Sequence, residues 1–240
     1  MKVYENVIIG NFLYGLGFTV GGFLRGQDAL PAIVNQLQQT PVDTELGDVL
    51  LTFPGLVRLI EFKMKGGDIK KERLRQRKLA LALSTPENAH LLAVSRSVHW
   101  YVEVAAKLSD TPLVCRAEPY VDALSDGHDR KAPGTFEHLI EHTAREAVGE
   151  LDPHERALAQ LYLRLVRMTL GKDSAGAGGL LLVVGGGGTM HFAHLQDVSD
   201  LNLPDRQWLT QALQVREPQL TQSGPRLEPQ EPQHGLTLSM

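Results

Sequence analysis

The first apolar residues of the chain recur at helical spacing. They are Val3, Val7, Ile8, Phe12 and Leu16. Gly17 follows this series, so the pattern predicts a helix over residues 3–16 that ends at the glycine. The β-branched and aromatic residues that come next predict a strand over residues 18–24, and a helix with a polar face is predicted over residues 28–39.

Two apolar segments flank a Pro-Gly pair in the next part of the chain. Residues 46–53 and 56–64 are rich in Val, Leu, Ile and Phe, and Pro54-Gly55 between them favours the turn of an antiparallel hairpin. Counting outward from this turn places Asp48 directly opposite Glu61, at a side-chain separation of about 5 Å. Because strand side chains alternate, Lys63 projects from the same face as Glu61. The hairpin therefore predicts two carboxylates and an ammonium at one site, which suits a divalent metal and an attacking water.

The rest of the chain alternates between helical and extended patterns. Gly66-Gly67 ends the second hairpin strand, and Asp68 can cap a helix over residues 68–83. Further strands are predicted over 90–95, 98–105, 113–116 and 180–184, and further helices over 135–150, 153–170 and 205–215. The end of the chain, from residue 217, is rich in Pro, Gln, Ser and Gly and predicts a disordered tail.

Composition describes a globular protein of ordinary charge. The chain has 240 residues, of which 42% are hydrophobic, and its formal net charge is −4. This net charge argues against coating of nucleic acid through bulk charge, yet residues 56–78 hold nine Lys and Arg residues. A positive field is therefore expected around the predicted site.

Cysteine content and the first apolar segment bear on localisation. The only cysteine is Cys115, which excludes an internal disulfide and fits a reducing compartment. Residues 7–24 carry no charge and have the length of a membrane helix or signal segment. Their five glycines, Asn11 and the preceding Glu5 favour a soluble helix followed by a strand, so a cytoplasmic protein without a membrane partner is expected.

The order of elements and the charged residues together resemble the PD-(D/E)XK nuclease superfamily, which has the restriction-endonuclease-like fold. The segment 47–51, with Asp48, resembles the second strand of that family, and 60–63, with Glu61-Phe62-Lys63, resembles its third strand. Residues 5–20 resemble its opening helix and strand. The resemblance covers roughly residues 3–105. It implies an α/β fold with an αβββαβ core and a mixed central sheet, followed by an α-rich C-terminal extension.

The resemblance also implies a function, metal-dependent cleavage of phosphodiester bonds in DNA. Asp48 and Glu61 would bind Mg²⁺ or Mn²⁺, with the backbone carbonyl of Phe62 as a further ligand and Glu5 completing the metal shell. Lys63 would orient or help to deprotonate the attacking water and offset charge that develops on the phosphate. The expected divisions are a nuclease-like core over 1–110, an α/β extension over 111–216 and the tail over 217–240. RNA as a substrate, a homodimer and a partner protein all stay open.

Basic residues directly follow the Glu61-Phe62-Lys63 motif. Lys70, Arg73 and Arg77 fall at positions i, i+3 and i+7 of the predicted helix and form one stripe. With Lys65 and Lys71, this stripe predicts phosphate contacts that position nucleic acid without reading its sequence. The alternative is a solvated helix surface.

Two other functions fit parts of the sequence. The triad could be vestigial, in a nuclease fold that serves as a scaffold or nucleic-acid-binding subunit of a larger assembly. Separately, His138-Leu139-Ile140-Glu141-His142 matches the H-x-x-E-H pattern of inverted zinc peptidases, with both histidines on one helical face. The surrounding sequence lacks the further pattern of such peptidases, so surface histidines on an amphipathic helix are the simpler interpretation.

Overall fold

The computed structural model describes residues 3–24, 30–36, 47–105, 113–171, 179–184 and 190–195. Contacts divide the chain into a unit over Met1–Pro204 and a second over Asp205–Met240. All the described residues belong to the first unit. The predicted helix over 205–215 and the predicted tail over 217–240 lie outside the described residues, as does the boundary expected at residue 110.

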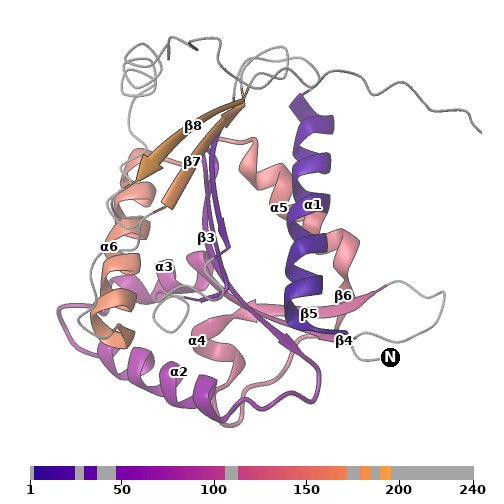
Figure 1. Cartoon of the computed structure of the whole chain (residues 1–240). Helices are drawn as coiled ribbons and strands as arrows, with labels where there is room; N and C mark the ends of the chain where they lie inside the picture. The colour runs from indigo at the N-terminus through magenta and orange to yellow at the C-terminus, as the bar shows by residue number, and fades with distance from the viewer. Residues whose placement is uncertain are drawn as a thin grey trace, which may run out of the picture. The chain divides into compact units, whose positions relative to one another are not determined.

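The first unit is an α/β structure built on one mixed sheet (Figure 1). Its elements are α1 (Glu5–Leu24), β1 (Leu30–Gln36), β2 (Val49–Phe53), β3 (Leu56–Met64), α2 (Lys70–Leu83), α3 (Leu91–Val98), β4 (His99–Ala105), β5 (Val114–Pro119), α4 (Tyr120–Ala123), β6 (Gly134–Thr135), α5 (Phe136–Ala147), α6 (Pro153–Leu170), β7 (Gly179–Val184) and β8 (Met190–Leu195). The sheet has the strand order β6-β5-β4-β3-β2-β1-β7-β8. The predicted α/β class and mixed sheet are confirmed.

The connection between β3 and β4 positions the helices of one face. β3 and β4 are parallel, whereas the other neighbouring strands pair antiparallel. Parallel strands require a crossover, and this one contains α2 and α3. The crossover therefore brings α2 back over the face of β3 from which Glu61 projects.

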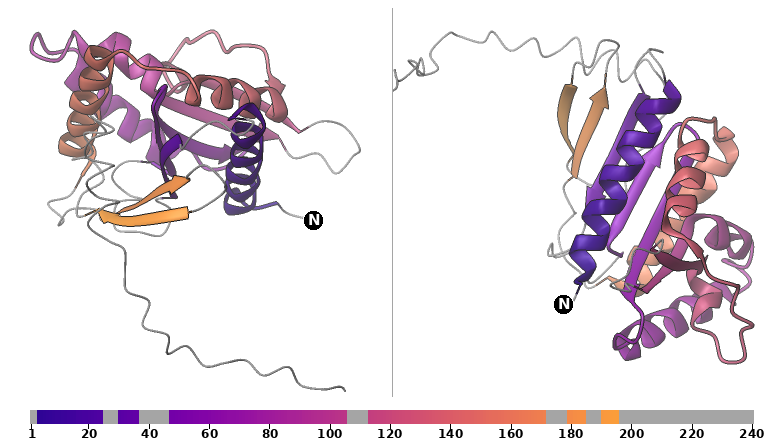
Figure 2. Two further views of the ribbon diagram at one scale, coloured as in Figure 1. Left: turned by 90° about the horizontal axis from the view of Figure 1, so that it is seen from above. Right: turned by 90° about the vertical axis from the view of Figure 1, so that its right-hand side faces the viewer.

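Helices cover both faces of the sheet, and each face has its own apolar core. α1 and α5 pack against Val49, Leu51 and Phe62 on one face, and they lie side by side in Figure 2. α2, α3, α4 and α6 pack with Leu50 and Leu59 on the other face. The alternation of side chains along β2 and β3 thus separates the two cores, as the hairpin pattern predicts.

The first two predicted elements after residue 16 are wrong. α1 continues through Gly17 to Leu24, because Phe12, Leu16 and Val20 keep the four-residue spacing and are all buried against the sheet. The predicted strand over 18–24 is therefore the end of this helix. The predicted helix over 28–39 is instead β1, which pairs with β2 and β7.

α1 is also long and apolar enough to cross a bilayer by length and composition. One side of α1 packs on the sheet, whereas Tyr14 and Phe18 on the other side are each 77% exposed.

The helices of the later chain agree only in part with the prediction. Residues 91–98 form α3 rather than a strand, whereas α5 and α6 lie within or at the bounds predicted for them.

Candidate functional site

The hairpin of β2 and β3 has the predicted register. Val49 pairs with Ile60, and Phe53 pairs with Leu56 across the Pro54-Gly55 turn. Asp48 lies one residue before β2, where its peptide N–H donates to the Ile60 carbonyl at 3.0 Å. The Asp48 carboxylate Oδ2 accepts a hydrogen bond of 2.7 Å from the Phe62 peptide N–H. This bond fixes the Asp48 carboxylate beside the strand segment that contains Glu61 and Lys63.

Lys63 lies between two carboxylates from different elements. Its Nζ is 2.9 Å from Glu61 Oε1 on the same strand and 3.4 Å from Glu5 Oε2 in the first turn of α1. Glu5 Oε1 also accepts a hydrogen bond from the Met64 peptide N–H at 3.3 Å. The packing of α1 on the sheet thus delivers Glu5 to the end of β3, as the sequence predicts.

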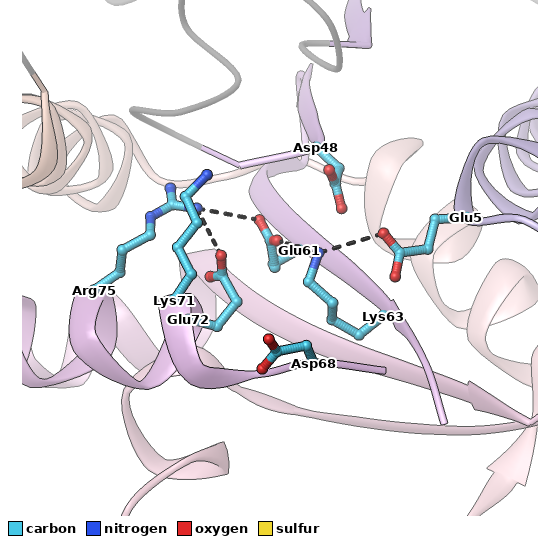
Figure 3. A pocket seen from close by; sticks show the side chains of 8 residues that line it. All are labelled: Glu5, Asp48, Glu61, Lys63, Asp68, Lys71, Glu72 and Arg75. Atoms are coloured by element: carbon cyan, nitrogen blue, oxygen red, sulfur yellow. Dashed lines mark hydrogen bonds and ion pairs between the residues drawn. The ribbon is translucent and has the colours of Figure 1, made fainter. Parts of the chain in front are cut away.

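A pocket of about 220 Å³ contains these four side chains (Figure 3). Its lining residues are Glu5, Asp48, Glu61, Lys63, Asp68, Lys71, Glu72 and Arg75. They come from α1, the start of β2, β3 and the start of α2 with its preceding turn. The pocket therefore combines five carboxyl groups with three cationic side chains.

Glu72 and Arg75 are members of this pocket that the sequence interpretation missed. Both project from the buried side of α2, and Arg75 Nη1 is 3.0 Å from Glu72 Oε1 and 3.9 Å from Glu61 Oε2. The signal was present in the spacing, because Glu72, Arg75, Gln76, Leu79 and Leu83 form one helical face. Leu74 and Leu81 of the same helix are instead 59% and 72% exposed.

The electrostatics of the pocket follow from burial of like charges. Burial, followed by the charges of Asp48 and Glu72, raises the pKa of Glu61 to about 8, although Lys63 and Arg75 oppose the rise. For Lys63, burial disfavours the ammonium, but the Glu61, Asp48 and Glu5 carboxylates outweigh it and raise the Lys63 pKa. The pocket therefore holds excess negative charge that a further cation would offset.

The donor set fits a hard divalent cation in kind. Carboxylate oxygens are the ligands that Mg²⁺ and Mn²⁺ prefer, and the raised pKa of Glu61 reflects first its burial and then the neighbouring Asp48 and Glu72 carboxylates. Among the described residues, no three or more His, Cys, Asp and Glu side chains already form a metal-binding group. The Lys63 ammonium lies against Glu61 and Glu5 in this arrangement.

No family model, curated protein or solved structure matches this chain.

The predicted nucleic-acid contacts lie on the surface around the pocket. Lys65, Lys70, Lys71, Arg73 and Arg77 are all exposed. Of these, Lys71 lines the pocket itself, and Arg77 lies 3.3 Å from Asp126 in an exposed ion pair. The structure thus puts these basic residues on the exposed surface of α2 and the turn before it, and Lys71 alone among the five lines the pocket.

The second motif, His138, Glu141 and His142, lies on the exposed side of α5. Glu141 is paired with Arg145 at 2.6 Å, and His142 Nδ1 is 3.1 Å from Glu146. Within the described ranges these three residues belong to no metal-binding group. Their contacts are the i, i+4 pairs expected on a solvated helix.

Proposed function

We propose that this protein is a metal-dependent nuclease of the restriction-endonuclease-like type that hydrolyses phosphodiester bonds in DNA. The observation that supports this proposal best is the convergence of Glu5, Asp48, Glu61 and Lys63 on one pocket from three separate elements. A solvated ion pair would leave Glu61 and Lys63 exposed. Instead, Glu61 is 3% exposed and is surrounded by further carboxylates.

Each side chain has a role that follows from its contacts. Asp48 and Glu61 would hold a Mg²⁺ or Mn²⁺ ion, with Glu5 and the Phe62 carbonyl as further ligands. When bound, such a cation supplies Lewis-acid polarisation of the phosphate and makes a bound water more acidic. Lys63, held between Glu61 and Glu5, donates to the water or to the phosphate oxygens on which charge develops.

The exposed basic residues of α2 support a polyanionic substrate. Lys70 and Arg73 are exposed on α2, the helix that also supplies Lys71 to the pocket, and they would contact phosphates of a bound strand. Such contacts would orient the strand without selecting its sequence. The proposed substrate is DNA, and the proposed localisation is the cytoplasm.

Plasmid cleavage tests the proposal. Purified protein is incubated with supercoiled plasmid, single-stranded DNA or RNA, each with Mg²⁺, Mn²⁺ or EDTA. We expect cleavage of DNA that requires the metal and is lost in both Glu61→Gln and Lys63→Ala. Cleavage that persists equally in both variants, purified in the same way, would come from another protein and would reject the site.

A non-catalytic scaffold is the second candidate, because Lys63 already neutralises part of the carboxylate cluster. That function requires DNA binding without cleavage under every metal condition. Zinc content of the purified protein separately tests the peptidase pattern at His138, Glu141 and His142. If the protein is a nuclease, replacement of these three residues should leave the zinc content unchanged.

A further inference from the structure

A buried series of charge contacts leads from the pocket into the C-terminal half of the chain. The two oxygens of Glu61 have different cationic neighbours, since Oε1 lies 2.9 Å from Lys63 and Oε2 lies 3.9 Å from Arg75. A carboxylate held from both sides cannot rotate freely about its last bond. The second of these neighbours comes from α2, a helix that the metal and water roles do not require.

Arg75 is itself held in place by a second carboxylate. Glu72 Oε1 lies 3.0 Å from Arg75 Nη1, and Glu72 Oε2 accepts a hydrogen bond of 2.9 Å from the Tyr120 hydroxyl. Glu72 thus has a close neighbour at each oxygen, whereas Glu61 has one close neighbour in Lys63 and a longer ion pair with Arg75. Glu72, Arg75 and Tyr120 are almost fully buried, so water screens their interactions only weakly.

Tyr120 anchors this series to the rest of the C-terminal half. Its ring stacks on the His99 ring with a centroid distance of 4.1 Å and an interplanar angle of 2°. His99 Nδ1 lies 2.9 Å from the Tyr162 hydroxyl of α6. Tyr120, His99 and Tyr162 are each at most 1% exposed. α4 and α6 therefore fix the far end of the contacts that reach Glu61.

We propose that Arg75 is a positioning residue for the Glu61 carboxylate, held in turn by Glu72 and Tyr120. The role of Glu61 in this inference rests on the proposed function, whereas the contact between Arg75 and Glu61 does not depend on it. It gives the expected extension over 111–216 a role in the site, because Tyr120 follows β5 and belongs to α4. An ordinary structural ion pair on α2 would stabilise the helix without affecting Glu61.

Two measurements on the full chain test the proposal. The first is kcat and KM for cleavage of supercoiled plasmid at saturating Mn²⁺, in Arg75→Met and Arg75→Lys. The second is a double-mutant cycle of Arg75→Met and Glu61→Gln, read from urea unfolding midpoints without metal. Arg96→Met is the control for loss of an arginine ion pair, because Arg96 pairs with Asp122 at 2.9 Å in a more exposed setting and lines no part of the pocket.

We expect kcat of Arg75→Met to fall at least tenfold with KM within twofold, and Arg75→Lys to recover part of the loss. The Arg96→Met control should stay within twofold of the wild type. The changes in unfolding midpoint that the two single variants cause should not sum to the change in the double variant. A kcat within twofold of the wild type together with additive midpoints would overturn the proposal.

The outcomes separate the proposal from the proposed function. If the wild type cleaves no DNA with any metal but the midpoints are non-additive, the nuclease function falls and the Arg75–Glu61 contact stands. If Arg75→Met does not fold, Tyr120→Phe carries the test, since it removes one hydroxyl and keeps the ring that stacks on His99. A threefold or larger fall in its kcat supports the proposal, and an unchanged kcat rejects it.

Discussion

The Asp48 carboxylate accepts a hydrogen bond of 2.7 Å from the peptide N–H of Phe62, the residue between Glu61 and Lys63. The acid at the start of β2 is thus tied to the backbone of the strand that supplies the other two charged groups. A backbone donor cannot swing away, so Asp48 has a fixed position relative to β3. This arrangement leads to predictions for each part of the pocket and for the hairpin that carries it.

Lys63→Met should abolish most of the proposed hydrolysis. The substitution keeps a long apolar side chain but removes the ammonium that lies 2.9 Å from Glu61. Loss of one preorganised donor to a developing charge costs about 100-fold or more in kcat. The measurement is single-turnover cleavage with excess protein, and a loss below threefold would exclude Lys63 from the chemistry.

Glu61→Gln should make the metal-free protein more stable at high pH. The folded-state pKa of Glu61 is raised to about 8 from an ordinary value of 4.5. Between these two values the folded state binds the proton more tightly than the unfolded state, so this group makes stability fall as pH rises through that window. A neutral amide removes that dependence, and the gain in unfolding free energy should reach a few kcal/mol by pH 8.

Urea unfolding in EDTA from pH 4.5 to 8 measures this effect. We expect the wild-type and Glu61→Gln proteins to be closest in stability at the acid end and to diverge as pH rises. Addition of Mg²⁺ should stabilise the wild type at pH 8 and leave the variant nearly unchanged. Parallel stability curves would mean that Glu61 is not a buried acid in solution.

Gly55→Ala should destabilise the hairpin strongly. A Cβ at Gly55 would overlap the Glu146 carbonyl oxygen and lie 2.6 Å from the Gly149 carbonyl carbon. These are backbone atoms that cannot move aside easily, so a loss of about 1–3 kcal/mol or more is expected. Gly10→Ala is the control, because a Cβ there meets nothing within 4 Å and alanine favours helix by up to about 1 kcal/mol. Thermal unfolding should therefore shift in opposite directions for the two variants.

The basic surface of α2 should control DNA affinity rather than the chemical step. Lys70→Gln with Arg73→Gln removes two exposed charges from α2. The slope of log affinity against log salt should fall by about one for each charge removed, with kcat nearly unchanged. Fluorescence anisotropy with labelled DNA in EDTA gives the slope. An unchanged slope would mean that this helix face is only solvated.

The parts of the fold that the sequence predicted well are those that depend on local chemistry. The Pro54-Gly55 turn sets the register by counting, so the pairing of Val49 with Ile60 could be predicted. The start of α6 at Pro153 is equally local, since proline suits the first turn of a helix. Such features need no knowledge of what packs against them.

The errors arose where packing overrode local signals. Gly17 is a common helix terminator, but burial of Leu16 and Val20 on the sheet carries α1 past it. The apolar run at 91–94 reads as a strand, yet Leu91, Ser95 and Val98 are the buried residues and have helical spacing. Glu72 and Arg75 were missed because residue type gives no sign that a charged side chain is buried beside a partner.

The buried position of Cys115 has a practical consequence for labelling. Burial, together with the nearby charge of Glu137, raises the pKa of this thiol to about 11, and the residue is 4% exposed. At neutral pH it will hardly form the thiolate that reacts with maleimides. Because the sequence contains no other cysteine, a single cysteine introduced on the surface would accept a fluorophore selectively while the native thiol is left in place.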